Sequence, residues 1–128
     1  MKINKIKETC LYVKDLEVSR KFYEEKLGLE LIGTVENRHI FFRAGSSVLL
    51  CFIAEVTKHE TLLPHFASGH MHLAFEVSRE EYNDWKDKIR NEHIEILHEH
   101  EWKDHLKSFY FNDPDNHVLE IVQEGMWD

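Results

Sequence analysis

The chain has 128 residues, 42% apolar and 12% aromatic, with five Gly and two Pro. This composition predicts one folded domain and excludes a disordered or collagen-like chain, because enough apolar surface is present to offset the ordering entropy. The net charge of −8 argues against a nucleic-acid partner, since phosphates would be repelled. No apolar run reaches the roughly 20 residues that span a bilayer, so no membrane role is expected. Two cysteines in apolar runs, with no secretory pattern ahead of them, favour reduced thiols in the cytoplasm.

The first half of the chain predicts a strand, a helix and three more strands. Residues 6–13 alternate and are rich in β-formers, and Asp15 then offers an N-cap for an amphipathic helix. Gly28 should end that helix, because glycine adopts the positive φ of a C-terminal cap without steric cost. Short strand signals follow at 30–34, 39–44 and 47–53. Residues 54–69 lack a clear period and predict a connection or a short helix.

The second half repeats this order. Residues 70–77 predict a strand, and Ser78 should cap a helix that carries Tyr82, Trp85 and Ile89. Three strand signals follow, at 94–98, 108–111 and 118–123. Residues 113–116, Asp-Pro-Asp-Asn, predict a tight hairpin turn, because the proline presets φ and the Asp and Asn side chains can close the turn.

Aligning the two halves predicts a domain with internal pseudo-twofold symmetry rather than a solenoid. Matching the first strands places Glu8 on His72, and matching the last strands places Leu50 on Glu120.

Strand side chains alternate between faces, so Glu8, His72 and Glu120 are each expected on the face opposite the more apolar one. The apolar faces should meet the helices. A carboxylate in the apolar run 118–122 costs free energy when desolvated, unless it finds a cation or several hydrogen-bond donors. From periodicity alone, a solvated sheet face without function explains Glu120 as well as a binding site does.

Several motifs resemble those of the vicinal-oxygen-chelate superfamily, which includes glyoxalases, bleomycin-resistance proteins and extradiol dioxygenases. Residues 8–16 with the following Ser19, Phe22-Tyr23 and Leu27-Gly28 resemble the opening of its first module. Residues 72–77 are similar to the opening of the second module, and 108–120 to its closing hairpin.

The resemblance implies an α+β fold in which two tandem βαβββ modules form a curved mixed sheet around a central cleft. It implies one domain over residues 1–128, with module one at about 5–53, a connection at 54–69 and module two at about 70–124.

The resemblance also implies metal ligands on the first and last strands of the modules. Carried over to this chain, these positions are Glu8, His72 and Glu120, whereas the fourth falls on Leu50, which cannot ligate. Two carboxylates and one imidazole suit a divalent ion such as Zn, Ni, Mn, Fe or Mg. Such an ion would bind a small molecule with vicinal oxygens in a lyase, isomerase, transferase or dioxygenase reaction. The alternatives are a metal-free, bleomycin-resistance-like binding protein and a relative with neither property.

Several residues are candidates for the general base. Glu76 and His70 share the strand face of His72, and Tyr110 could also line the cleft. His39 and Ser108 are further candidates, although ordinary packing or surface positions explain each of these residues as well. Fosfomycin modification is not expected, because the basic residues that a phosphonate needs are not evident.

The histidine-rich stretch containing His93, His98, His100 and His105 predicts a solvated acidic loop rather than a metal tract. Trp102 lies in that stretch and could cover the cleft. Relatives of this size usually form homodimers with sites completed across the interface, which implies that Glu8 serves a different cleft from His72 and Glu120 of its own chain.

Overall fold

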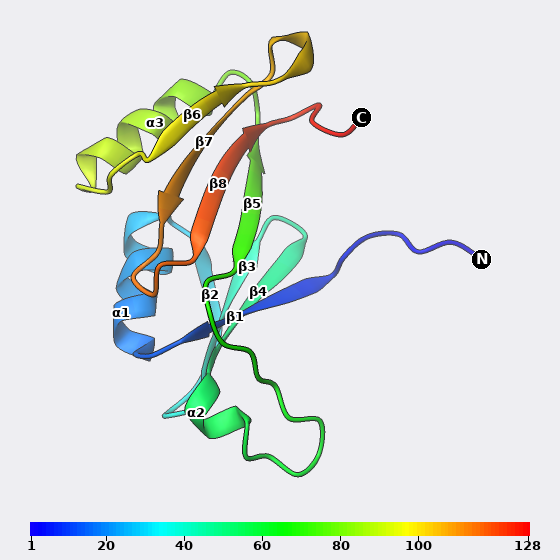
Figure 1. Ribbon diagram of the computed structural model, residues 1–128, viewed down its shortest axis with the longest axis vertical. Helices are drawn as coiled ribbons and strands as arrows, with labels where there is room; N and C mark the ends of the chain where they lie inside the picture. The colour runs from blue at the N-terminus through cyan, green and yellow to red at the C-terminus, as the bar shows by residue number, and fades with distance from the viewer. The chain divides into compact units, whose positions relative to one another are not determined.

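The computed structural model describes residues 1–128, which form two units, Met1–Gly69 (unit 1) and His70–Asp128 (unit 2). Each unit contains one four-stranded mixed sheet, and the order of elements in each is βαβββ (Figure 1). The predicted fold class, α+β with two tandem modules, is therefore confirmed. The cleft that the modules would share stays a prediction.

In unit 1 the strand order is β1-β4-β3-β2, with β1 parallel to β4 and the other neighbours antiparallel. The strands are β1 (Glu8–Val13), β2 (Glu30–Val35), β3 (His39–Ala44) and β4 (Ser47–Ile53). All four agree with the predicted strands to within two residues at either end. A shift in register between Leu31 and Gly33 interrupts the β2–β3 ladder.

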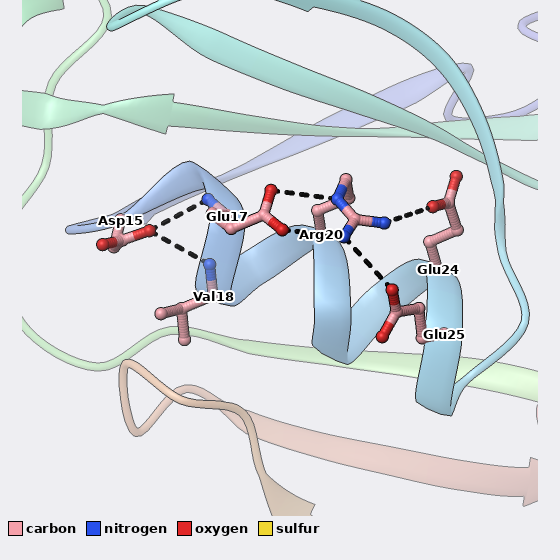
Figure 2. Close-up of polar contacts among 6 residues, drawn as sticks. All are labelled: Asp15, Glu17, Val18, Arg20, Glu24 and Glu25. Atoms are coloured by element: carbon pink, nitrogen blue, oxygen red, sulfur yellow. Dashed lines mark hydrogen bonds and ion pairs between the residues drawn. The ribbon is translucent and has the colours of Figure 1, made fainter.

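The predicted first helix consists of α1 (Leu16–Arg20) and a π-helical continuation, η1 (Lys21–Lys26). Asp15 caps it as predicted, since its Oδ1 accepts hydrogen bonds from the backbone N–H groups of Glu17 and Val18 at 2.9 and 3.0 Å (Figure 2). Arg20 adds ion pairs with three glutamates, Glu17, Glu24 and Glu25. Gly28 follows with φ of 78°, in the left-handed region that favours glycine.

The core of unit 1 lies between this helix and its sheet. Leu11 and Val13 of β1 are buried, as the alternation predicts. Tyr23 of the helix and Phe42 of β3 are fully buried, with ring centroids 5.5 Å apart. Aromatic burial of this kind supplies much of the hydrophobic stabilisation of a small unit.

The connection after β4 begins with a short helix, α2 (Ala54–Thr57), and belongs to unit 1. The Thr57 hydroxyl donates to the backbone carbonyl of His65 at 2.5 Å, and the His65 ring stacks on Phe52 at 4.7 Å. Arg38 makes two hydrogen bonds to the Glu60 carboxylate, at 2.6 and 3.0 Å. These contacts hold the connection against Phe52 of β4 and against Arg38, the residue before β3.

In unit 2 the strand order is β5-β8-β7-β6, with β5 parallel to β8. The elements are β5 (His72–Val77), α3 (Tyr82–Asn91), β6 (His98–Glu101), the 3-10 turn η2 (Lys103–His105), β7 (Lys107–Asn112) and β8 (Val118–Gln123). Helix α3 packs on the sheet through the buried Tyr82 and Ile89, while Leu119 and Ile121 are buried on β8.

Several predicted features of unit 2 differ from the structure. Strand β5 begins at His72, so His70 lies before it. Ser78 does not cap α3 directly. Its hydroxyl pairs with the side chain and backbone N–H of Glu81, at 3.1 and 3.3 Å, in the turn that precedes Tyr82.

The predicted strand at 94–98 is also wrong, because β6 starts only at His98. The backbone N–H of Ile94 is used by the end of the helix, where it donates to the carbonyl of Ile89 at 3.1 Å, and His93 has a φ of 59°. The chain therefore joins the sheet later than its β-propensity suggests.

The predicted hairpin turn between β7 and β8 is confirmed. Asp113 Oδ1 accepts hydrogen bonds from the backbone N–H groups of Asp115 and His117, at 2.9 and 2.8 Å. Asn116 adopts a φ of 62°, a conformation that asparagine tolerates better than most residues. No helix in the structure has both the length and the apolar character needed to cross a membrane.

Candidate functional site

A cavity of about 220 Å³ lies on one face of the unit 2 sheet. Its lining consists of His72, Ala74, Trp102, Tyr110, Glu120, Val122, Met126 and Trp127. Residues directly opposite each other on neighbouring strands share a face. Ala74, Glu120 and Tyr110 stand in one such row across β5, β8 and β7. The cavity therefore lies on the face opposite the buried Leu119 and Ile121.

Glu120 is the buried carboxylate of this face, with a residue exposure of 8%. Its neighbours along β8, Leu119 and Ile121, are apolar and buried on the other side. Ala74 stands opposite Glu120, and both residues line the cavity. A desolvated carboxylate in this position requires a cation or hydrogen-bond donors.

His72 faces Glu120 from β5. The Nδ1 atom of His72 lies 2.8 Å from the carbonyl oxygen of Val118, and its Nε2 atom lies 3.3 Å from Oε2 of Glu120. Because a carbonyl oxygen only accepts hydrogen bonds, Nδ1 carries the proton. The Nε2 atom and the carboxylate oxygen therefore face each other as two acceptors unless a cation joins them.

Either a second proton on the imidazole or a metal ion satisfies this pair. An N–H held by a backbone carbonyl, with the other ring nitrogen directed at the site, is the usual arrangement of a metal-binding histidine. The His72 side chain is 52% exposed, so Nε2 can be reached from solvent. These two residues fit a divalent ion in both donor chemistry and orientation.

The third predicted ligand, Glu8, is an exposed residue at the start of β1 in unit 1. Its register repeats that of His72: Glu8 stands opposite Val48 as His72 stands opposite Val118. The structure brings His72 and Glu120 together, and no group of three or more His, Cys, Asp or Glu side chains gathers as a metal site in the chain. Glu8 as a ligand stays a prediction.

Of the three candidates for acid–base chemistry, Tyr110 alone lines the cavity. Burial raises the pKa of its phenol, and the charge of Glu120 acts in the same direction. Tyr110 therefore keeps its proton at neutral pH and can donate it in a hydrogen bond. Glu76 is exposed on the same face of β5 but outside the cavity lining, and His70 is exposed before the strand.

The two further candidates, His39 and Ser108, make structural contacts. His39 in unit 1 stacks on Phe41 at 4.0 Å and lies next to Arg38. Burial and the charge of Arg38 lower the pKa of His39. Ser108 is fully buried and accepts a hydrogen bond from Nε1–H of Trp102 at 2.8 Å. Trp102 lines the cavity and is held there by this bond.

Sequence reasoning missed two residues on this face, His98 and His100. They belong to the stretch expected as a solvated acidic loop, and His98 was also expected at the end of the strand predicted at 94–98; both lie on the exposed strand β6. The alternating His-Glu-His-Glu at 98–101 has the two-residue period of a strand and could have shown it. Met126 and Trp127 also line the cavity, and no periodic signal marks them.

Three comparisons bear on this fold and site. Among curated proteins, the chain is 27% identical over 123 residues to the metallothiol transferase FosB of Staphylococcus epidermidis, covering 94% of this chain and 82% of that protein. It is 28% identical over 122 residues to the glutathione transferase FosA of Serratia marcescens, covering 93% and 80%. The crystal structure of a lactoylglutathione lyase from Agrobacterium tumefaciens superposes with a TM-score of 0.91 at 28% identity, covering 98% and 97% of the two chains.

The family profile described as Glyoxalase/Bleomycin resistance protein/Dioxygenase superfamily matches residues 5–121, which run from the first strand into β8 and include the His72–Glu120 pair. The chain therefore belongs to the glyoxalase, bleomycin resistance protein and dioxygenase superfamily.

Proposed function

We propose that this chain binds a divalent metal ion through Glu8, His72 and Glu120 and acts as a transferase or lyase on a small thiol or its adduct with a vicinal-oxygen compound. The observation that carries the proposal is the His72–Glu120 pair, whose Nε2 and Oε2 atoms face each other at 3.3 Å while the other ring nitrogen is held by Val118. The names of the relatives, metallothiol transferase and lactoylglutathione lyase, support the reaction class.

A bound divalent ion would act as a Lewis acid on the oxygens of the substrate. The residues of the chain have separate roles around it. His72 presents a fixed ring nitrogen, because its Nδ1–H is committed to the carbonyl of Val118. Glu120 supplies negative charge in a buried position. The Tyr110 hydroxyl, which retains its proton, would donate a hydrogen bond to a substrate oxygen in the cavity.

A substrate other than a phosphonate remains our expectation. None of the eight residues that line the cavity is Lys or Arg, the side chains that most often bind phosphonate and phosphate groups. The apolar side chains of Trp102, Val122 and Met126 instead offer a surface for the carbon skeleton of a small organic molecule.

Metal titration of the purified protein tests the proposal. We expect about one Mn²⁺, Ni²⁺, Zn²⁺ or Fe²⁺ per chain by elemental mass spectrometry. We also expect a loss of affinity of at least about tenfold in Glu8→Ala, His72→Ala and Glu120→Ala, because removing a ligand should cost at least as much as removing an outer-shell partner. His70→Ala is the matched control, because this exposed histidine lies two residues from His72 and outside the strand. Wild-type affinity in the His72 or Glu120 variant would refute the site.

A metal-free binding protein is the second candidate function, and the largely apolar lining of the cavity favours it. In that case the wild-type protein binds none of the four ions after incubation. Organic ligands would then bind equally well with and without a chelator such as EDTA. Ligand binding that requires the metal would exclude this second function.

A further inference from the structure

We propose that His98 and His100 form a carboxylate-binding subsite for the far end of an elongated substrate, on the same sheet face as the His72–Glu120 pair; this rests on the proposed function. The register places the two sites on one face. His98 stands opposite Tyr110, and Tyr110 stands opposite Glu120, so the three side chains form one row across β6, β7 and β8. His100 stands opposite Ser108 in the next row.

Both imidazoles are placed by aromatic neighbours. The His98 ring lies 6.1 Å from Tyr110, and the His100 ring meets Trp102 edge-on, with centroids 4.3 Å apart. Trp102 is itself fixed by its hydrogen bond to the buried Ser108. His98 and His100 are nevertheless exposed, so their ring nitrogens can be reached by a ligand.

The carboxylates of β6 do not occupy this face. Glu99 and Glu101 alternate with the two histidines and therefore point to the other side of the sheet. Glu99 forms an ion pair with Lys86 of α3, which packs on that side, and Glu101 lies 3.6 Å from Nδ1 of His105. Two N–H donors thus stand on this face without a carboxylate of their own strand beside them.

The separation of the two rings excludes one kind of ligand, a flat aromatic group stacked between them. A flat aromatic group held between two rings needs about 7 Å between them, or two van der Waals contacts. The centroids of His98 and His100 are 5.9 Å apart, which is too close for such a sandwich. A carboxylate needs no stacking space, and its two oxygens can each accept one N–H, which an imidazole offers in either protonation state.

The position of the subsite indicates the length of the substrate. Two strand spacings separate Glu120 from His98, or about 10 Å. That distance corresponds to roughly three extended residues of peptide. A tripeptide-sized thiol with a terminal carboxylate spans it, and a compact diol or keto acid does not.

Two probes that differ in one carboxylate test the subsite: glutathione and its glycine monoethyl ester. Calorimetry of the Mn²⁺-supplemented protein should show glutathione binding about fivefold to tenfold more tightly than the ester, the range expected for hydrogen bonds to a charged group near solvent. The double variant His98→Phe/His100→Phe keeps the rings but removes the N–H donors, and it should bind both probes equally. His105→Phe, at an exposed histidine in the next turn, should keep the wild-type preference.

The outcomes separate the two proposals. Equal binding of both probes by the wild-type protein, or a preference that persists in the double variant, overturns the subsite and leaves the metal site intact. If the Mn²⁺-supplemented wild-type protein holds no metal, measured in the same samples, the proposed function is overturned instead. Binding of neither probe by protein that holds its metal removes the thiol substrate, and the subsite with it.

Discussion

Leu50 and Glu120 occupy the same position in their two sheets. Leu50 of β4 stands opposite Cys10, the third residue of β1, and Glu120 of β8 stands opposite Ala74, the third residue of β5. Each is 8% exposed. One position of the repeated fold thus carries an apolar side chain in unit 1 and a carboxylate in unit 2. The backbone pairing is therefore the same in the two units, while the side chain at this position differs.

Substituting glutamine at each position should affect stability very differently. Leu50→Gln should lower the free energy of unfolding by about 2–4 kcal/mol, because it replaces a buried apolar side chain with an amide that lacks a partner. Glu120→Gln should change it by less than about 1 kcal/mol, since the shape is kept and a desolvated charge is removed. The same Glu120 variant should lose metal affinity at least about tenfold.

Urea unfolding and metal titration measure the two effects on the same preparations. If Leu50→Gln has the same urea midpoint of unfolding as the wild-type protein, the side chain at position 50 is not buried in solution. If Glu120→Gln binds metal as the wild-type protein does, the carboxylate is not a ligand.

Mixing two inactive variants should show whether Glu8 acts across a homodimer. If each site takes Glu8 from one chain and the His72–Glu120 pair from its partner, a heterodimer of Glu8→Ala and Glu120→Ala chains contains one intact site and one site that lacks both ligands. Each homodimer of a single variant contains none. When the two chains are co-expressed with different tags, we expect the purified heterodimer to hold about half of the wild-type metal content, because one of its two sites is intact.

The matched control is a pair that cannot complement. Chains carrying His72→Ala and Glu120→Ala both damage the same half of the site, so their heterodimer should bind no metal in the shared arrangement. Recovery in neither mixture, from protein shown to be dimeric, would place all three ligands within one chain. A protein that is strictly monomeric by light scattering would contradict the shared site outright.

The stability of unit 1 should depend on pH through His39. Burial and the charge of Arg38 lower the pKa of this imidazole, and Nη1 of Arg38 lies 2.5 Å from its Nδ1. The unfolded chain then binds a proton more readily than the folded one. The neutral His39 ring therefore contributes to the free energy of unfolding. This contribution is fully present above the ordinary histidine pKa of about 6.5, and it is lost as the pH falls below that value toward the lowered pKa of the folded protein.

We therefore expect the Tm to fall between about pH 7.5 and 5.5, and the fall to be smaller in His39→Phe, which keeps the stacking on Phe41. The pKa of Glu60 is also lowered, by its hydrogen bond with Arg38, but that carboxylate titrates at lower pH. His105→Phe alters an exposed ring and should leave the pH dependence unchanged. An unchanged slope in His39→Phe would assign the pH dependence to another group.

The features that were predicted correctly depend on local sequence. The N-cap at Asp15, the end of the helix at Gly28 and the turn closed by Asp113 each follow from one side chain and its immediate neighbours. The alternation of apolar and polar residues also identified seven of the strands closely. The eighth, β6, was misplaced because the end of α3 uses a backbone N–H that the strand prediction had assigned to the sheet.

By itself, the sequence determined the two βαβββ modules and which faces of their strands are apolar. Both features follow from local patterns, because apolar residues recur with a period of two in strands and 3.6 in helices. Only the tertiary structure decided that Nε2 of His72 faces the carboxylate of Glu120, and that His98 shares their sheet face. Those relationships depend on which strands pair and in which register. Register is set by contacts between residues far apart in the chain, and a shift of one residue would turn each side chain to the other face.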